Sequence, residues 1–249
     1  MFTRLLVGLD GSSAADVALE QAVELGRRFH ATVVVAHVRE RGAPSATALL
    51  ERARTRVLAA ELEVETLERS GDPEAVLGEL ALDADCTLVG RRGTVAGGAA
   101  LGATVAALVR TAEKPVIVCG GSVSPMRQCG VAFDGRGASL RALDLAGRYG
   151  SIAGSTVHLI HANDDRDAGL QVVGQAEAVL SLHGVPFVTH VEAGLPAEVV
   201  GRVVRRIGAD ALFAGAHVAR EAPGRPSPVV VSHAEEILRR TDIPVVIQP

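Results

Sequence analysis

A glycine-rich loop is the stretch of this 249-residue chain best suited to chemistry. It follows a short apolar run that ends at Gly90, and it contains glycines at 93, 97, 98 and 102 before an apolar helical pattern over residues 103–111. Glycines let a backbone approach an anion, and the free N–H groups at a helix start point at it, so this arrangement is typical of phosphate binding. The loop lacks the closing Gly-Lys-Ser/Thr of a Walker A sequence and the spacing of a dinucleotide fingerprint. The pattern alone therefore leaves two alternatives open, phosphate binding and a loop that only makes a tight turn.

The elements that would position this loop alternate between strands and helices. Strand patterns cover residues 4–9, 32–38, 64–67, 86–89 and 115–119, and helical patterns cover residues 14–25, 46–62, 73–82 and 103–111. This alternation predicts right-handed crossovers and a parallel sheet covered on both faces. Ligands of such sheets bind at the carboxyl ends of the strands, where the strand order reverses. Asp10, Val38 and Gly90 all follow predicted strand ends, so the sequence predicts a site at this edge.

The same pattern then occurs a second time, after a short linker at residues 120–125. Matching positions recur at offsets of 123 to 129 residues: Asp10 and Asp134, His37 and His161, Gly71 and Gly194, Gly90 and Gly215, and Pro115 and Pro244. A nearly constant offset over the whole length indicates two copies of one domain. We expect domain 1 at residues 1–121 and domain 2 at residues 127–249.

Composition narrows the classes of function. Hydrophobic residues make up 48% of the chain and charged residues 22%, so it can bury a sizeable core. A net charge of −4 and an aromatic content of 2% argue against a nucleic-acid partner. No apolar run reaches the ~18 residues of a membrane span, and the first residues do not resemble a signal peptide, so we expect a cytoplasmic protein without a membrane segment. Cys86, Cys119 and Cys129 form no C-x-x-C, and we expect them to be small buried hydrophobes.

Both halves resemble universal stress protein domains. The resemblance covers nearly everything outside the linker and rests on Asp10 at a strand end, on His37-Val38 after the second strand and on the glycine loop. It implies an α/β fold of two tandem Rossmann-like domains of the adenine nucleotide alpha hydrolase type, each a five-stranded parallel sheet in order 3-2-1-4-5 flanked by helices. It also implies that the two domains pair as separate members do in a dimer, with a homodimer as a further expectation.

The resemblance implies an adenine nucleotide, ATP with or without Mg²⁺, in domain 1. Asp10 would hold the adenine or ribose edge, the backbone of Val38 would contact adenine, and Val89 and Gly90 would line the ribose. The loop glycines and the residues after them would wrap the phosphates. The implied binding set is Asp10, Gly11, Ser12, Val38, Val89, Gly90, Gly93, Gly102, Ala103 and Thr104. No catalytic or metal-ligating residue is expected.

The sequence departs from the nucleotide-binding pattern of that family, which has G-x-x-G, nine residues, and then Gly followed by Ser or Thr. Only eight residues separate Gly93 from Gly102, and Ala103 stands where the hydroxyl belongs. One lost hydrogen bond to a charged group is worth about 1.5–3 kcal/mol, which would weaken ATP binding by one or two decades.

The second copy departs further from the pattern. Two valines replace loop glycines, and three prolines in the loop lack an N–H donor: Val218 and Val231, and Pro223, Pro226 and Pro228. We expect this copy to be a structural partner, or to accept another ligand.

Three functions remain as alternatives. The first is a nucleotide-binding stress-response regulator or adaptor with an unidentified protein partner and at most slow ATP hydrolysis. The second is an interaction module of the same family that binds no nucleotide, which Ala103 and the shortened loop favour. The third is an α/β enzyme acting on nucleotides, and the absence of a Ser-His-Asp set or of paired carboxylates counts against it. For single residues, Asp10 could instead be a helix-starting carboxylate, and His37 and His161 are expected to be packed side chains.

Overall fold

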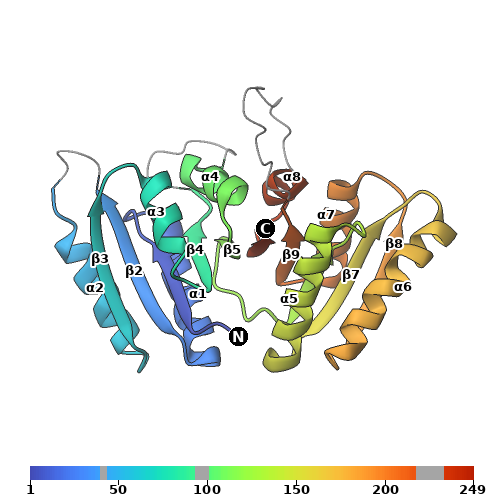
Figure 1. Ribbon diagram of the computed structural model, residues 1–249, viewed down its shortest axis with the longest axis horizontal. Coiled ribbons are helices and arrows are strands. Elements are labelled where there is room, and N and C mark those ends of the chain that lie inside the picture. The colour runs from blue at the N-terminus through green and yellow to red at the C-terminus, as the bar shows by residue number, and fades with distance from the viewer. Residues whose placement is uncertain (40–43, 93–100, 217–232) are drawn as a thin grey trace. The chain divides into compact units, whose positions relative to one another are not determined.

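A computed structural model describes residues 1–39, 44–92, 101–216 and 233–249 of the chain. The chain divides into two compact units, Met1–Pro125 and Met126–Pro249. In both units strands alternate with helices along the chain (Figure 1). No helix within the described residues is both long and apolar enough to cross a membrane.

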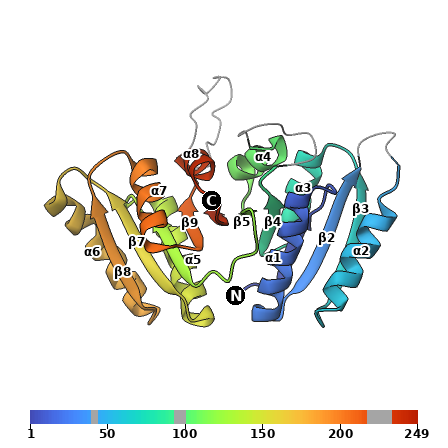
Figure 2. The same ribbon diagram turned by 180° about the vertical axis from the view of Figure 1, so that it is seen from behind.

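The first unit is a parallel sheet covered by helices. Its strands are β1 (Arg4–Gly8), β2 (Thr32–Arg39), β3 (Val64–Ser70), β4 (Cys86–Gly90) and β5 (Val116–Cys119). Its helices are α1 (Ser13–Phe29), α2 (Thr47–Leu58), α3 (Pro73–Ala81) and α4 (Ala103–Thr111). The strands pair in the order β3-β2-β1-β4-β5, in agreement with the expected 3-2-1-4-5 order. Helices α1 and α2 cover one face and α3 and α4 the other (Figure 2).

Burial explains which residues form this sheet. Leu5, Leu6 and Val7 of β1 are all buried, as expected for a central strand with helices on both faces. The edge strand β3 runs three residues beyond the predicted 64–67, because its polar end still pairs with β2 as far as Ser70. Apolar runs therefore mark the central strands well and the edge strand less well.

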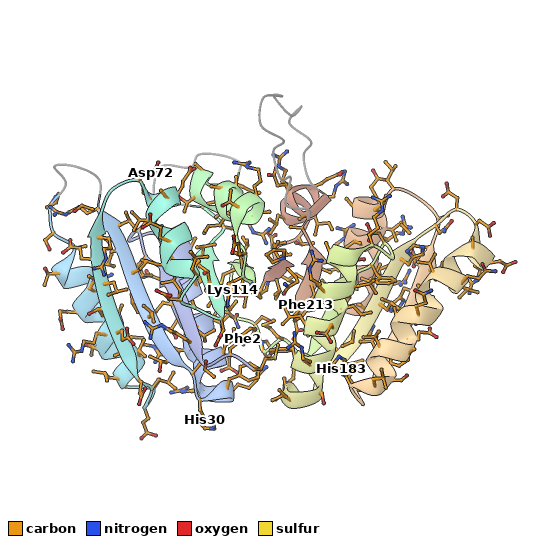
Figure 3. All side chains as sticks on the ribbon, in the orientation of Figure 1. Phe2, His30, Asp72, Lys114, His183 and Phe213 are labelled. Atoms are coloured by element: carbon orange, nitrogen blue, oxygen red, sulfur yellow. The ribbon has the colours of Figure 1, made fainter. Side chains whose placement is uncertain are left out.

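Helix starts follow the expected capping chemistry. Helix α3 has Pro73 in its first turn, and Asp72 caps it by accepting the Glu74 N–H at 2.9 Å. Helix α1 ends at His30, which takes a left-handed φ of 54°. Asp72 lies at the carboxyl edge of the sheet and His30 at the opposite edge (Figure 3).

A half-buried aspartate, Asp85, anchors the amino edge of the first unit. The Asp85 carboxylate accepts hydrogen bonds from the Thr3 N–H at 2.7 Å, the Thr3 hydroxyl at 2.6 Å and the Arg4 N–H at 3.0 Å. Burial would raise the pKa of this carboxyl, but the hydrogen bonds outweigh it and hold the pKa below its ordinary value. Asp210 accepts from the Arg127 and Gln128 N–H groups in the same way in the second unit.

The second unit repeats the architecture. Its strands are β6 (Gln128–Ala132), β7 (Thr156–Ala162), β8 (Phe187–Glu192), β9 (Ala211–Gly215) and β10 (Val245–Gln248). Its helices are α5 (Gly137–Ala153), α6 (Arg166–Leu182), α7 (Pro196–Ile207) and α8 (His233–Arg240). The parallel strands pair in the order β8-β7-β6-β9-β10, so each strand takes the place of its counterpart in the first unit.

The core of the second unit contains the one tyrosine of the sequence. Tyr149 of α5 is 1% exposed, and its ring lies 5.8 Å from that of Phe213 on β9, centroid to centroid. Figure 3 marks Phe213 on its strand. Elsewhere the core of both units is mainly aliphatic, with Phe2 and Phe133 as further buried aromatic residues.

All three cysteines are buried free thiols, which confirms the sequence prediction. Burial raises the pKa of Cys119 to about 12, so this thiol stays protonated and unreactive near neutral pH.

Candidate functional site

The predicted site lies where β1 and β4 are neighbours in the sheet. After β1 the chain crosses to the α1 face, and after β4 it crosses to the α4 face, so the strand order reverses between these two strands (Figure 1). Such a switch point opens a crevice at the carboxyl edge of a parallel sheet. Two connections leave this edge: residues 9–12 after β1, and residues 91–102 after β4.

The turn after β1 is held by its own polar groups. Asp10 Oδ1 accepts the Ser12 N–H at 2.9 Å, and Gly11 has a φ of 82°, in the left-handed region that favours glycine. Ser12 then caps α1 by accepting the Ala15 N–H at 3.1 Å. Asp10 is exposed. The turn therefore presents a carboxylate at the carboxyl edge from a well-defined backbone.

Gly90 ends β4 directly against the start of α1. A β-carbon at residue 90 would lie 2.5 Å from the Ala14 carbonyl carbon and 2.8 Å from the Ala15 nitrogen, so only glycine fits there. The preceding Val89 is 4% exposed, and its side chain belongs to the core. Val89 and Gly90 can therefore contact a ligand only through their main-chain atoms.

Two hydrogen bonds to main-chain carbonyls hold the two ends of the connection from β4 to α4. The Gly102 N–H donates to the Arg91 carbonyl at 3.3 Å, and the Ser12 hydroxyl donates to the Arg92 carbonyl at 3.4 Å. Both ends of the loop and the Asp10 turn are thereby brought together. Gly93, a predicted phosphate contact, lies outside the described residues.

Helix α4 begins without a side-chain cap. Gly102 occupies the N-cap position, its carbonyl accepts the Ala106 N–H at 3.0 Å, and no side-chain hydrogen bond caps the helix within the described residues. Ala103 is exposed and Thr104 is half-buried. An uncapped helix start offers main-chain N–H groups to an anion, and the alanine adds no hydroxyl to them.

Val38 lies near the end of β2, next to the Asp10 turn. Leu9, one residue before Asp10, donates its N–H to the Ala36 carbonyl at 2.8 Å and accepts a hydrogen bond from His37 Nδ1 at 2.8 Å. The structure thus brings the predicted residues of β1, β2 and β4 to one edge. It also adds His37, which sequence reasoning treated as a packed side chain; its recurrence as His161 was the available signal.

The corresponding edge of the second unit is arranged differently. Asp134 Oδ1 accepts the Ser139 hydroxyl at 2.6 Å as well as the Arg136 N–H at 2.9 Å. The N-cap of α5 is Arg136, whose side chain makes no capping hydrogen bond. Gly215 approaches Ala138 as Gly90 approaches Ala14. The loop that contains Val218, Val231 and the three prolines, residues 217–232, lies outside the described residues.

Within the described ranges, no group of three or more His, Cys, Asp or Glu side chains is arranged to hold a metal ion. A cavity of 350 Å³ lies between α1 and α2, and its lining contains none of the predicted site residues: Leu9, Asp16, Leu19, Glu20, Leu49, Arg52, Ala53 and Arg56.

The fold and the edge site define a doubly wound α/β protein with two similar units. Residues 1–120 match the model of the universal stress protein family, so the first half of the chain contains a domain of this family. The resemblance and the α/β fold class predicted from the sequence are confirmed.

Solved structures give the same picture. A universal stress protein from Archaeoglobus fulgidus matches with a TM-score of 0.79 at 20% identity, over 98% of this chain and 97% of that chain, which shows the shared fold of both halves. A universal stress protein in complex with cAMP matches at 28% identity and a TM-score of 0.42, over 47% of this chain and 95% of that one. A universal stress protein family protein from Arabidopsis thaliana with AMP bound matches at 21% identity and a TM-score of 0.38, over 46% and 88%. No curated protein matches the chain.

Proposed function

We propose that domain 1 binds an adenine nucleotide, with ATP as the expected ligand, and that the protein acts as a stress-response regulator or adaptor. The observation that carries this proposal is the meeting of the exposed Asp10 carboxylate, the glycine-tight end of β4 at Gly90 and the uncapped start of α4 at one switch point. Carboxylates recognise hydroxyl and amino donors, and helix starts recognise phosphate. A nucleotide has these groups at its two ends.

The described residues fit such a ligand. The absence of a β-carbon at Gly90 lets the start of α1 pack directly against the end of β4, and α4 begins at the same edge with its first N–H groups uncapped by a side chain. Other universal stress proteins have been solved with cAMP or AMP, which is the ligand class that we carry over here. Mg²⁺, where present, would neutralise phosphate charge. We assign it no protein ligand.

We propose domain 2 as a structural partner rather than a second nucleotide site. Its aspartate, Asp134, already accepts a short hydrogen bond from Ser139. Its loop carries Pro223, Pro226 and Pro228, which offer no N–H to a phosphate.

The remaining features of the proposal follow from the same reasoning. We keep residues 1–121 and 127–249 as the domain limits, propose a protein partner rather than a substrate, and assign no catalytic residue. The three reduced thiols support a cytoplasmic location, because oxidising compartments favour disulfides.

Calorimetric titration of the whole protein with ATP and Mg²⁺ tests this proposal, using the wild type, Gly102→Val and the matched pair Asp10→Ala and Asp134→Ala. We expect one site, an affinity loss of tenfold or more in Gly102→Val and Asp10→Ala, and wild-type affinity in Asp134→Ala. Absence of binding up to millimolar ATP would leave the interaction module that binds no nucleotide. Two sites would show that domain 2 binds as well, and rapid product formation from ATP would point to an enzyme.

A further inference from the structure

The hydrogen-bond ladder between β1 and β2 stops one bond short of its expected end. The last paired residues are Gly8 and Ala36, and Leu9 still donates its N–H to the Ala36 carbonyl at 2.8 Å. In a parallel ladder, a residue that gives its N–H to one carbonyl of the neighbouring strand gives its own carbonyl to the N–H two residues further on. The Leu9 carbonyl would therefore pair with the Val38 N–H.

The imidazole of His37 donates a hydrogen bond to the Leu9 carbonyl instead. Its Nδ1 lies 2.8 Å from the Leu9 oxygen, and because a carbonyl only accepts, Nδ1 carries the proton. Val38 faces the same side of β2 as Ala36, since main-chain groups alternate along a strand. Within the described residues, the Val38 N–H finds no partner on β1. The His37 side chain thus ends the hydrogen-bond ladder between β1 and β2 just before Val38.

The second unit contains the same arrangement. Phe133 donates its N–H to the Ile160 carbonyl at 2.9 Å, and His161 Nδ1 lies 2.9 Å from the Phe133 oxygen. Most side chains around these positions differ between the two units, as Leu9 and Phe133 do. The recurrence of one geometry in two diverged copies indicates a device that the fold uses, rather than an accidental contact.

We propose that His37 is a positioning residue for the nucleotide site, an inference that rests on the proposed function. By holding the Leu9 carbonyl it reserves the N–H and C=O of Val38 for a ligand and fixes the main chain directly before Asp10. An adenine base presents a ring-nitrogen acceptor beside an amino donor. One strand residue whose N–H and C=O both face a crevice is complementary to that pair, so this position selects adenine over bases without it.

A leucine at residue 37 would remove the competing donor. The ladder can then extend by a hydrogen bond from the Val38 N–H to the Leu9 carbonyl. The Val38 N–H is then no longer free to donate to the adenine base. An asparagine would keep the arrangement, because its amide nitrogen occupies nearly the place of the histidine Nδ1. Leucine at residue 161 is the matched control, since it makes the same change in the other unit.

Amide hydrogen exchange at Val38, followed by NMR in the whole ligand-free protein, tests the geometry directly. We expect fast exchange in the wild type and in His37→Asn, and exchange at least tenfold slower in His37→Leu. Slow exchange of Val38 in the wild type would overturn the proposal, whatever the protein binds.

ATP titration of the same variants tests the consequence for binding. We expect His37→Leu to lose tenfold or more in affinity, His37→Asn to lose less than threefold, and His161→Leu to match the wild type. Wild-type affinity in His37→Leu would also overturn the proposal. If the wild type binds no adenine nucleotide, the proposed function fails, and the Val38 exchange rates still decide whether His37 opens the ladder. Should His37→Leu fail to unfold cooperatively in a thermal melt, the wild-type exchange rate and His37→Asn decide the question.

Discussion

The hydroxyl of Ser139 donates a 2.6 Å hydrogen bond to the carboxylate of Asp134. In the first domain the position equivalent to Ser139 is Ala15, so Asp10 has no hydroxyl beside it from that position. The Ser139 hydroxyl restrains Asp134. Asp10 accepts a hydrogen bond from the Ser12 N–H of its own turn. The two aspartates therefore differ in one side-chain hydrogen bond from the start of the following helix.

Ala15→Ser should transfer that restraint to the first domain. Ala15 is buried at the start of α1, and a serine adds one hydroxyl that can reach Asp10 as Ser139 reaches Asp134. Competition with a hydrogen bond worth about 1 kcal/mol predicts an ATP affinity lower by about fivefold. Calorimetric titration measures this change. An unchanged or stronger affinity would contradict a ligand role for Asp10.

Gly90→Ala should destabilise the first domain. The new methyl would collide with the Ala14 carbonyl and the Ala15 nitrogen, which are backbone atoms and cannot rotate away. Overpacking of this kind costs about 1–3 kcal/mol in the free energy of unfolding, measured by urea denaturation. Gly78→Ala in α3 is the control, because nothing lies within 4 Å of its added β-carbon, and it should stabilise by about 0.5–1 kcal/mol. Equal effects at the two glycines would refute the packing argument.

Ser12→Ala should affect both stability and binding. The variant loses the cap on the Ala15 N–H and the contact with the Arg92 carbonyl. Loss of a helix cap costs about 1 kcal/mol, and a loosened loop should lower ATP affinity as well. Ser13→Ala is the matched control, since Ser13 is exposed and its hydroxyl has no role in the cap. Chemical denaturation and titration of both variants give the comparison, and parallel behaviour would remove Ser12 from the site.

A histidine pair should make the second domain sensitive to acid. His158 Nδ1 lies 3.2 Å from His190 Nε2, and His158 Nε2 lies 2.8 Å from Gln128 Oε1. Burial lowers the pKa of His158, and the nearby His190 lowers it further. Burial also lowers the pKa of His190, with Arg206 adding to the effect and Glu192 opposing it. Both imidazoles therefore titrate below the ordinary histidine pKa of 6.5 in the folded domain.

The sign of this effect follows from proton binding. Below pH 6.5 the two histidines bind protons more readily in the unfolded domain than in the folded one. The stability that their neutral forms contribute is therefore fully present above that pH and is lost as the pH falls. The first domain has Val34 and Leu67 at the equivalent positions. We expect His158→Val combined with His190→Leu to flatten the decline of the melting temperature between pH 7.5 and 5.5. An equally steep decline in the double variant would place the sensitivity elsewhere.

Much of the fold was predictable because its strands are buried on both faces. Continuous apolar runs and helix-starting residues such as Asp72 and Pro73 marked the element order, and the constant offset from Asp10 to Asp134 marked the duplication. Helix α1 runs to Phe29, beyond the predicted end near Gly26, because its end is set by the left-handed conformation of His30. Apolar periodicity carries no signal for that conformation.

The positions of the candidate site residues in the fold were predictable, but their contacts were not. Asp10, Gly90 and the start of α4 were placed at strand and helix ends by pattern alone. The hydrogen bond from His37 to Leu9 depends on a side-chain rotamer and on where the β1–β2 hydrogen-bond ladder stops. Residue spacing predicts neither of these. The clash that excludes a β-carbon at Gly90 likewise depends on how closely α1 approaches β4.

The buried pairing of Tyr149 with Phe213 has a spectroscopic consequence. The sequence has no tryptophan and one tyrosine, so ultraviolet emission excited near 280 nm comes from the second domain alone. The first domain, whose aromatic rings are phenylalanines such as Phe2 and Phe29, is silent at that wavelength. The unfolding of domain 2 can therefore be followed by tyrosine fluorescence while calorimetry records the unfolding of the whole protein. A difference between the two transition temperatures would reveal that the duplicated halves unfold independently.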